Sequence, residues 1–246
     1  NTVFITTRHD SHTQFVAESL EAGKNVYVEK PLAMTLRELD KIQSSILNNK
    51  SSILMVGFNR RFAPHIVRIK TLLDARRQPK SFIITVNAGA VSPDHWTQDP
   101  EMGGGRIIGE ACHFIDLMCF LSGSPIKEWS VQSMGNDTLK DKVTINLKFK
   151  DGSLGSIHYF ANGSKRFPKE RIEVFCGGGI IQLDNFRKMK GYSWPGFKKM
   201  NLHRQDKGHK AEVDAFVEAV KRGEPSPIPF EELIEISRTT IEIAST

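Results

Sequence analysis

Cysteine is scarce in this chain, with three residues in 246, at Cys112, Cys119 and Cys176. An odd number without regular spacing excludes the disulfide framework that stabilises small secreted domains. No apolar stretch approaches the ~18 residues that cross a membrane, and no signal-peptide pattern opens the chain. We therefore expect a cytoplasmic protein with reduced thiols and no membrane partner.

Concentrated charge of one sign is also missing. The net charge is +6, but the Lys and Arg residues are scattered, with only short clusters such as residues 187–190. This dispersal argues against a nucleic-acid partner and is compatible with either a small anionic ligand or a solvated basic surface. The hydrophobic fraction of 39% is enough for one large core or two smaller ones.

The first 57 residues alternate strands with helices. Strands are expected at residues 3–6, 26–28 and 52–56, and Thr35 and Glu38 form a capping box before the second helix. Short connections between such elements are typical of a parallel α/β sheet. Because three strands make half of a doubly wound sheet and no G-x-G-x-x-G loop is present, residues 1–57 are predicted to be the C-terminal half of a Rossmann domain. An unpaired apolar edge is then expected at residues 3–5 or 26–28.

Residues 58–246 follow a different pattern, which predicts an α+β domain. Polar and apolar residues alternate strictly over residues 143–149, and Asp151-Gly152 is typical of a hairpin turn. We expect a large, mostly antiparallel sheet with helices near residues 64–73, 106–121 and 208–222. A last helix starts at Phe230, and whether it packs back on the Rossmann part is left open.

The strand at residues 26–28 ends in Glu29, Lys30 and Pro31. Open α/β sheets bind their ligands at the carboxyl ends of their strands. Neighbouring side chains on a strand point to opposite faces, so Glu29 and Lys30 are expected to have different roles. The alternative is a surface ion pair beside a turn.

The predicted helix after the three glycines at 103–105 carries Glu110, His113 and Asp116 at i, i+3 and i+6. A histidine flanked by carboxylates suits proton transfer near neutral pH, although it could also be hydrogen-bonded within a core. The glycines do not match a phosphate-binding motif. His9 and His12 have no third ligand nearby, so no metal site is expected.

Taken together, these stretches resemble the Gfo/Idh/MocA oxidoreductases, which include glucose–fructose oxidoreductase and inositol 2-dehydrogenase. The resemblance is carried by residues 7–12, 22–31, 57–62, 103–105, His113, Asp116 and 208–209. It implies a Rossmann domain for NAD or NADP and a C-terminal domain whose open sheet often forms a homo-oligomer. It also implies hydride transfer between the nicotinamide and a hydroxyl carbon of a sugar, cyclitol or sugar derivative.

The resemblance also implies roles for individual residues. Lys30 and His113 are the expected catalytic pair, meeting across a cleft around one substrate carbon. The cofactor-binding residues are expected to be Thr7, Arg8, His9, His12, Glu29 and Lys30. The substrate-binding residues are expected to be Asn59, Arg61, Trp96, Glu110 and Asp116.

Two positions depart from the family pattern. Many members have Asp-x-x-x-His on the pocket helix, but here the first position is Gly109, and Glu110 beside it points about 100° away on an α-helix. Arg8 stands where many members of the family have a proline. Both departures resemble the subgroup of the family that is fused behind a zinc alcohol dehydrogenase-like domain. The alternative function is a non-catalytic ligand-binding or assembly domain of a larger fusion. Alone, the chain is expected to be inactive and to bind dinucleotide weakly.

Overall fold

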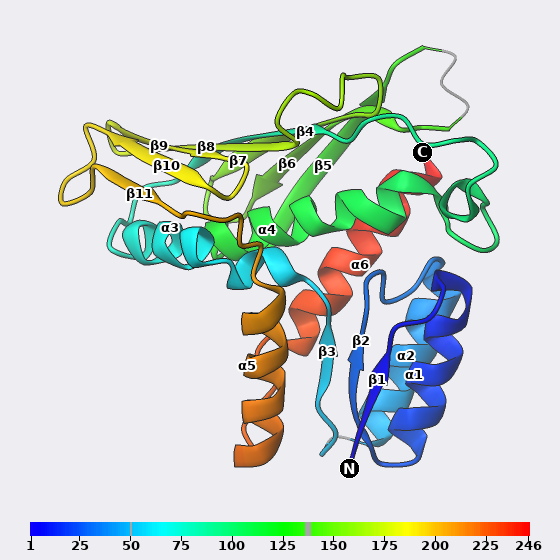
Figure 1. Cartoon of the computed structure of the whole chain (residues 1–246). Helices are drawn as coiled ribbons and strands as arrows, with labels where there is room; N and C mark the ends of the chain where they lie inside the picture. The colour runs from blue at the N-terminus through cyan, green and yellow to red at the C-terminus, as the bar shows by residue number, and fades with distance from the viewer. Residues whose placement is uncertain (50, 136–138) are drawn as a thin grey trace. The chain divides into compact units, whose positions relative to one another are not determined.

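The structure, a computed structural model, describes residues 1–49, 51–135 and 139–246 (Figure 1). The chain forms two compact units that are each discontinuous in sequence, and they are described separately. The first unit comprises Asn1–Phe58, Pro93–Cys112 and Lys210–Thr246, and the second comprises Asn59–Ser92 and His113–His209. The domain limits 1–57 and 58–246 stay a prediction.

The first unit is built on a small parallel sheet with strand order β1-β2-β3. Its strands are β1 (Thr2–Ile5), β2 (Asn25–Val28) and β3 (Leu54–Val56). Its helices are α1 (His12–Glu21), α2 (Leu36–Asn48), α5 (His209–Arg222) and α6 (Phe230–Ser245). The parallel α/β arrangement expected from the alternation of strands and helices is therefore confirmed.

Helices cover the sheet of the first unit on both faces (Figure 1). The register pairs Phe4 with Tyr27, and the Phe216 ring of α5 packs against both, with ring centroids 5.5 Å and 5.7 Å away. Helix α1 packs on β1 and β2 and buries Val16 and Leu20. Side-chain alternation along the strands thus places aromatic packing on one face and aliphatic packing on the other.

Strand β2 lies in the middle of this sheet, because it pairs with both β1 and β3. The expectation of an unpaired edge at residues 26–28 is therefore wrong, and β1 forms one edge of the sheet. On this edge strand, the large apolar side chain of Phe4 is 47% exposed.

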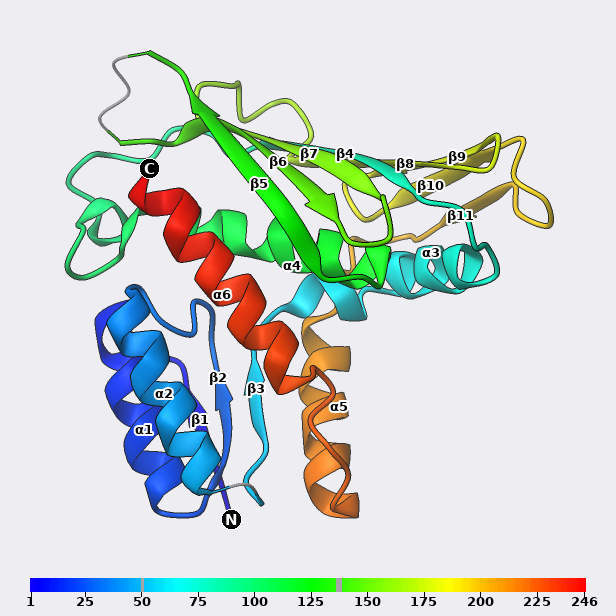
Figure 2. The same ribbon diagram turned by 180° about the vertical axis from the view of Figure 1, so that it is seen from behind.

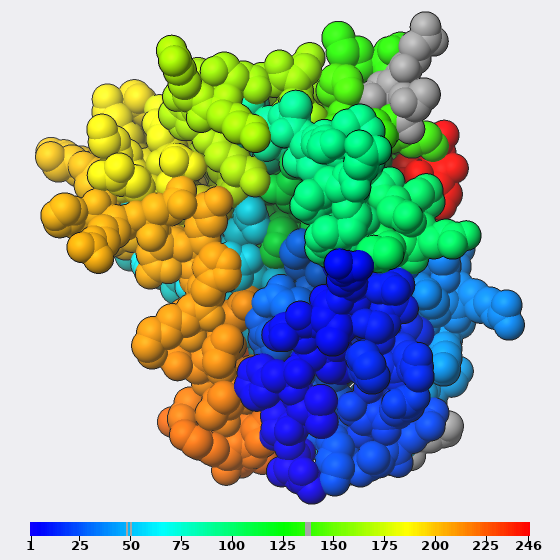
Figure 3. All heavy atoms as spheres, turned by 45° about the vertical axis from the view of Figure 1, so that its right-hand side comes forward, coloured from blue at the N-terminus to red at the C-terminus, as the bar shows by residue number. Residues whose placement is uncertain are grey.

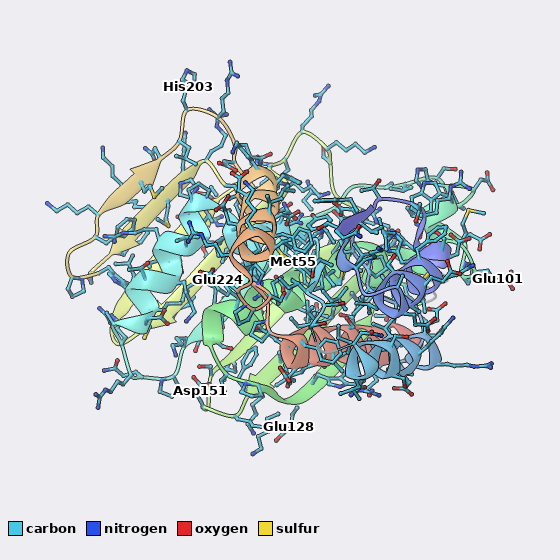
Figure 4. The ribbon with its side chains drawn as sticks, turned by 90° about the horizontal axis from the view of Figure 1, so that it is seen from below. Met55, Glu101, Glu128, Asp151, His203 and Glu224 are labelled. Atoms are coloured by element: carbon cyan, nitrogen blue, oxygen red, sulfur yellow. The ribbon has the colours of Figure 1, made fainter. Side chains whose placement is uncertain are left out.

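The capping box of α2 forms as predicted. The Glu38 amide donates to Thr35 Oγ1 at 3.2 Å, and the Thr35 amide donates to Glu38 Oε2 at 3.0 Å. Helix α6 lies beside α2 (Figure 4), and Arg238 donates to Asp40 Oδ1 at 3.1 Å. The last helix therefore packs within the unit that contains the Rossmann-like sheet.

The second unit is built on an eight-stranded sheet with order β11-β10-β9-β8-β4-β7-β6-β5. Among the described residues of this sheet, only β4 and β7 pair in parallel, so the expected mostly antiparallel sheet is confirmed. Helices α3 and α4 lie along one face of it (Figure 2). The elements are α3 (Pro64–Asp74), β4 (Ser81–Asn87), α4 (Cys112–Ser122), β5 (Ile126–Ser133), β6 (Lys142–Phe149), β7 (Leu154–Phe160), β8 (Glu170–Cys176), β9 (Gly179–Asp184), β10 (Lys188–Tyr192) and β11 (Lys199–Asn201).

Strands β10 and β11 were not expected from the sequence. Lys188 and Lys190 suggest a solvated basic cluster, but Met189 between them is 1% exposed. On a strand, alternate residues share a face, so one buried methionine between two lysines is consistent with a sheet that is wet on one side.

The predicted helix at 106–121 has two parts. It begins as a π-helix at Ile107–Ala111, labelled η4, and continues as α4. A π-helix accommodates one more residue per hydrogen-bonded turn than an α-helix. The angle of 100° expected between Gly109 and Glu110 therefore does not apply here. Short 3₁₀ turns also occur at η1 (His9–Ser11), η2 (Asn59–Phe62) and η3 (Trp96–Gln98).

A buried charge cluster stabilises the second unit. Glu170, at the start of β8, accepts from Arg60 Nε at 3.1 Å, from Arg60 Nη2 at 2.9 Å and from Lys207 Nζ at 2.6 Å, and its side chain is fully buried. Burial by itself raises the pKa of Glu170, but the charges of Arg60 and Lys207 outweigh it and lower the pKa overall.

Replacing Glu170 should therefore be strongly destabilising. In Glu170→Ala, the buried Arg60 guanidinium loses its counter-charge, and breaking such a pair costs about 3–5 kcal/mol. Chemical denaturation measures the free energy of unfolding. The matched control is Asp214→Ala, which removes only the exposed pair with Lys210 and should cost less than about 1 kcal/mol. Equal losses in both variants would contradict a stabilising role for the Glu170 cluster.

Candidate active site at the carboxyl ends of β1 and β2

The loop after β1 is held in place by its own polar side chains. Ser11 Oγ donates to Thr7 Oγ1 at 2.7 Å and lies 2.9 Å from the Arg8 carbonyl oxygen. His12 is fully buried, with Nδ1 2.7 Å from the Pro31 oxygen and Nε2 3.1 Å from the Thr7 oxygen. His12 therefore ties the loop after β1 to the turn that carries Lys30.

Lys30 and Glu29 contact different parts of the first unit, as strand alternation predicts. Lys30 Nζ donates to the Gly109 carbonyl oxygen at 2.5 Å. Glu29 instead lies beside Gly57, where a Cβ atom would be 3.0 Å from Glu29 Oε2, and it hydrogen-bonds with Tyr27. The amine is thus held at the end of β2, on the rim where parallel sheets bind ligands.

His9 lies close to Lys30 and is 6% exposed. Its Nδ1 is 2.7 Å from the Gly103 carbonyl oxygen, and its ring meets Trp96 edge-on with centroids 4.8 Å apart. Burial lowers the pKa of His9 to about 4, the Gly103 bond opposes this, and the positive charge of Lys30 lowers it further. His9 is therefore a neutral imidazole at physiological pH.

The segment Pro93–Cys112 packs against the loop after β1 (Figure 3). Arg8 Nη1 donates to Met102 Sδ at 2.9 Å, and the Arg8 guanidinium carbon lies 5.8 Å from the centroid of the Trp96 ring. The Asp10 amide also donates to the Met102 oxygen at 3.3 Å. In contrast, Glu101 points into solvent at the edge of the molecule (Figure 4).

Gly109, where the family resemblance implies aspartate, leaves room for the His9 ring. A Cβ atom on Gly109 would lie 3.0 Å from His9 Cε1, closer than nine in ten real Cβ contacts, so the ring would have to shift. The neighbouring Glu110 pairs with Arg106 at 2.7 Å on the same helical segment.

Other expected site residues belong to the second unit. His113 is 6% exposed on α4. Arg61 and Asp116 form a buried ion pair, with Arg61 Nε 3.1 Å from Oδ1 and 3.2 Å from Oδ2. Asn59 Nδ2 donates to the Lys207 oxygen at 2.9 Å and lies 3.2 Å from His209 Nε2. These contacts give Arg61, Asp116 and Asn59 positioning roles within their unit, and their contact with substrate stays a prediction.

The structure thus brings together Thr7, Arg8, His9, His12, Lys30 and Trp96 around the carboxyl ends of β1 and β2. Glu29 faces Tyr27 and Gly57, and the meeting of Lys30 with His113 stays a prediction.

The sequence did not indicate Met102 or the Gly103 carbonyl as parts of the site. Backbone acceptors and a thioether carry no sequence signal of their role, whereas the adjacent glycines at 103–105 did mark the segment.

Within the described ranges, no group of three or more His, Cys, Asp and Glu side chains is arranged to hold a metal ion. None of the helices in that part of the chain is long and apolar enough to cross a membrane.

Comparison with known proteins identifies the family. Residues 1–58 match the model of an oxidoreductase family with an NAD-binding Rossmann fold, and residues 66–182 match that of the GFO/IDH/MocA C-terminal domain. The chain belongs to the Gfo/Idh/MocA family. The expected family, the dehydrogenase class and a nicotinamide dinucleotide cofactor are thereby confirmed, whereas membership of the subgroup fused to a zinc alcohol dehydrogenase-like domain stays a prediction.

Members of the family with similar sequences include two inositol dehydrogenases. The chain is 25% identical over 244 residues to myo-inositol 2-dehydrogenase of Thermotoga maritima, covering 94% of this chain and 72% of the relative. It is 24% identical over 235 residues to inositol 2-dehydrogenase of Rhizobium meliloti, covering 90% and 70%. It spans 55% of oxidoreductase YrbE of Bacillus subtilis, at 26% identity over 75% of this chain.

Solved structures of the family share the fold. An oxidoreductase domain protein from Kribbella flavida superposes with a TM-score of 0.86 at 23% identity, covering 99% of this chain and 77% of that one. A levoglucosan dehydrogenase in complex with NADH and levoglucosan superposes with a TM-score of 0.85 at 19% identity, with the same coverage.

The residues at the strand ends fit a nicotinamide cofactor of this family. The Thr7 and Ser11 hydroxyls and the Lys30 amine have the chemistry to hydrogen-bond a ribose hydroxyl, and Thr7 is exposed. Parallel sheets place dinucleotides at the carboxyl ends of their strands, where these groups lie.

The stability of the protein should fall as the pH is lowered from 6.5 to 4. The folded-state pKa of His9 is depressed to about 4, whereas the unfolded chain binds this proton near pH ~6.5. Stability is therefore retained above pH ~6.5 and lost on acidification, by up to about 3 kcal/mol from this group. Denaturation of wild type and His9→Asn across this range isolates the contribution, since His65, whose pKa burial also lowers, is common to both. If the free energies of unfolding of wild type and His9→Asn changed in parallel with pH, the lowered pKa of His9 would be contradicted.

Proposed function

We propose that this chain acts in an NAD(P)-dependent dehydrogenase that transfers a hydride between nicotinamide and a hydroxyl-bearing carbon of a sugar, cyclitol or sugar derivative. The observation that carries the proposal is the Lys30 amine, fixed on the Gly109 carbonyl oxygen at the carboxyl end of β2. The inositol 2-dehydrogenases among the similar sequences and the levoglucosan complex among the similar structures support a polyol substrate.

Lys30 has the hydrogen-bonding capacity for this role. An ammonium group has three N–H donors, and the bond to Gly109 occupies one of them. The others are available for the oxygen of the reacting carbon and for a ribose hydroxyl. The bond to Gly109 also limits the motion of a long side chain, so the amine meets the substrate in one position.

Oxidation of the alcohol removes a proton from oxygen and a hydride from carbon. The nicotinamide cofactor supplies the hydride acceptor. We propose that His113, or Lys30 when it is in the neutral amine form, accepts the proton and that the other residue polarises the oxygen. That these two residues act on one substrate stays a prediction of the family resemblance.

Gly109 favours a second candidate function, a non-catalytic ligand-binding or assembly domain. The family resemblance implies a carboxylate at this position, and the chain has none there. A protein that binds a polyol in calorimetry but never changes the absorbance of NADH at 340 nm would support this alternative.

We further propose a cytoplasmic homo-oligomer formed through the large sheet. On the face opposite the buried residues of β4, Ile83, Leu154 and Phe160 are 37%, 54% and 38% exposed. Within the second unit, α3 and α4 lie along the other face. Exposed apolar side chains gathered on one face are typical of a protein interface.

Replacing Lys30 tests the dehydrogenase proposal. Lys30→Met keeps the length of the side chain but removes its donors and charge, so kcat/KM for oxidation of the best polyol should fall by about 10²–10⁴-fold. The measurement is NADH formation by the full-length protein with a panel of cyclitols and sugars. The matched control, Lys210→Met, replaces an 88% exposed lysine and should keep wild-type kinetics. Lys30→Met with undiminished turnover would contradict the proposal.

A further inference from the structure

The imidazole of His9 is a second polar group beside Lys30, and the reaction proposed above does not use it. His9 opens the short η1 turn directly after the β1 loop. Its Nδ1 lies 2.7 Å from the Gly103 carbonyl oxygen, and Trp96 packs edge-on against its ring. The ring is therefore held in one orientation by a backbone acceptor and an aromatic neighbour.

The contact with Gly103 determines which ring nitrogen carries the hydrogen. A carbonyl oxygen can only accept, so Nδ1 donates, and in a neutral ring Nε2 is then an unprotonated acceptor. Burial, with the nearby charge of Lys30, keeps the ring neutral by lowering its pKa to about 4. The Lys30, His12 and Asp10 side chains are the charged or titratable groups that act on the ring.

Nε2 of His9 has an open side. Among the described residues, Nε2 has no hydrogen-bond partner. It is also not fully buried, because it is absent from the buried polar atoms without a partner in that part of the chain. The 6% of the residue that remains exposed is consistent with access of a small ligand to this nitrogen. Nε2 is thus an acceptor whose orientation is fixed by the protein, and it is suited to accept a hydrogen bond from a ligand hydroxyl.

Gly109 connects this acceptor to Lys30. Its carbonyl oxygen accepts from Lys30 Nζ at 2.5 Å, while the place of its missing Cβ lies 3.0 Å from His9 Cε1. Any other residue at position 109 would press on the ring next to Nε2. The backbone of Gly109 is not in the left-handed region that favours glycine, so the His9 ring, rather than backbone strain, is the obstacle to a side chain here.

We propose that His9 is a specificity-determining residue whose Nε2 accepts a hydrogen bond from a second hydroxyl of the polyol, beside the oxygen that Lys30 contacts. This inference rests on the proposed function. The two groups are complementary, because an ammonium only donates and this nitrogen only accepts. The site would thus select a substrate that carries a further hydroxyl near the reacting one, over its deoxy analogue.

His9 is not proposed as the general base. A nitrogen with a pKa of about 4 is a weak base at neutral pH, whereas it still accepts a hydrogen bond. Its loss should therefore weaken substrate binding more than it slows the reaction, which separates His9 from Lys30.

The tautomer of His9 can be tested without measuring enzymatic activity. In ¹⁵N-correlated NMR spectra of the full-length protein, His9 should show a protonated Nδ1 and an unprotonated Nε2, with no titration between pH ~5.5 and ~8. The spectrum of His9→Asn identifies the signals. A protonated Nε2, or a titration midpoint near pH ~6.5, would overturn the inference.

Kinetics test the role in recognition. In His9→Asn the amide can still donate to the Gly103 oxygen, but no acceptor remains at Nε2, so KM for the polyol should rise about 5–10-fold, as for one lost hydrogen bond, with kcat within about 2-fold. For a deoxy substrate that lacks the recognised hydroxyl, wild type and His9→Asn should have the same KM. The control His158→Asn lies on β7 in the other unit and should leave both substrates unaffected.

Gly109→Ala provides an independent variant. The new methyl group should displace the His9 ring and raise KM in the wild-type background, and it should have less effect when combined with His9→Asn, since the two changes act on one contact. If the effects of Gly109→Ala and His9→Asn on KM were additive, the inferred contact between residue 109 and the His9 ring would be overturned. If the wild-type protein is active but His9→Asn has an unchanged KM, only the inference about His9 fails. If the wild-type protein transfers no hydride to any polyol, the proposed function fails and the inference fails with it.

Discussion

The hydrogen bond from the Lys30 amine to the Gly109 carbonyl oxygen is the constraint on which the candidate site depends. It joins the end of a parallel strand to a π-helical turn 79 residues further along the chain. Without it, a lysine at a strand end would be a flexible cation in water. With it, the amine has a fixed position at the rim of the sheet, where open α/β sheets bind their ligands.

Several glycines make this arrangement possible. A Cβ atom on Gly103 would lie 2.4 Å from Thr97 Cα, so only glycine lets the chain pass and present its carbonyl oxygen to His9. The absence of a side chain at Gly109 leaves space for the His9 ring. The glycine at 109, which departs from the family pattern, is thus explained by the histidine at 9, which lies 100 positions earlier in the sequence.

Local patterns predicted most of the fold and part of the site. The capping box of α2, the alternation along β6 and the turn at Asp151-Gly152 depend on neighbouring residues, so they could be read directly. The pairing of His9 with Gly103 joins residues 94 apart, and that of Arg61 with Asp116 joins residues 55 apart. Such contacts depend on tertiary packing that no local pattern encodes. Strands β10 and β11 were missed because lysines obscured a single buried methionine.

A crystal structure of the full-length protein with its nicotinamide cofactor and a polyol that it oxidises would test the central claim most directly. A substrate oxygen should lie within about 3.2 Å of Lys30 Nζ, with the amine still bonded to the Gly109 oxygen. A polyol bound with Lys30 turned away from it, or released from Gly109, would contradict the account.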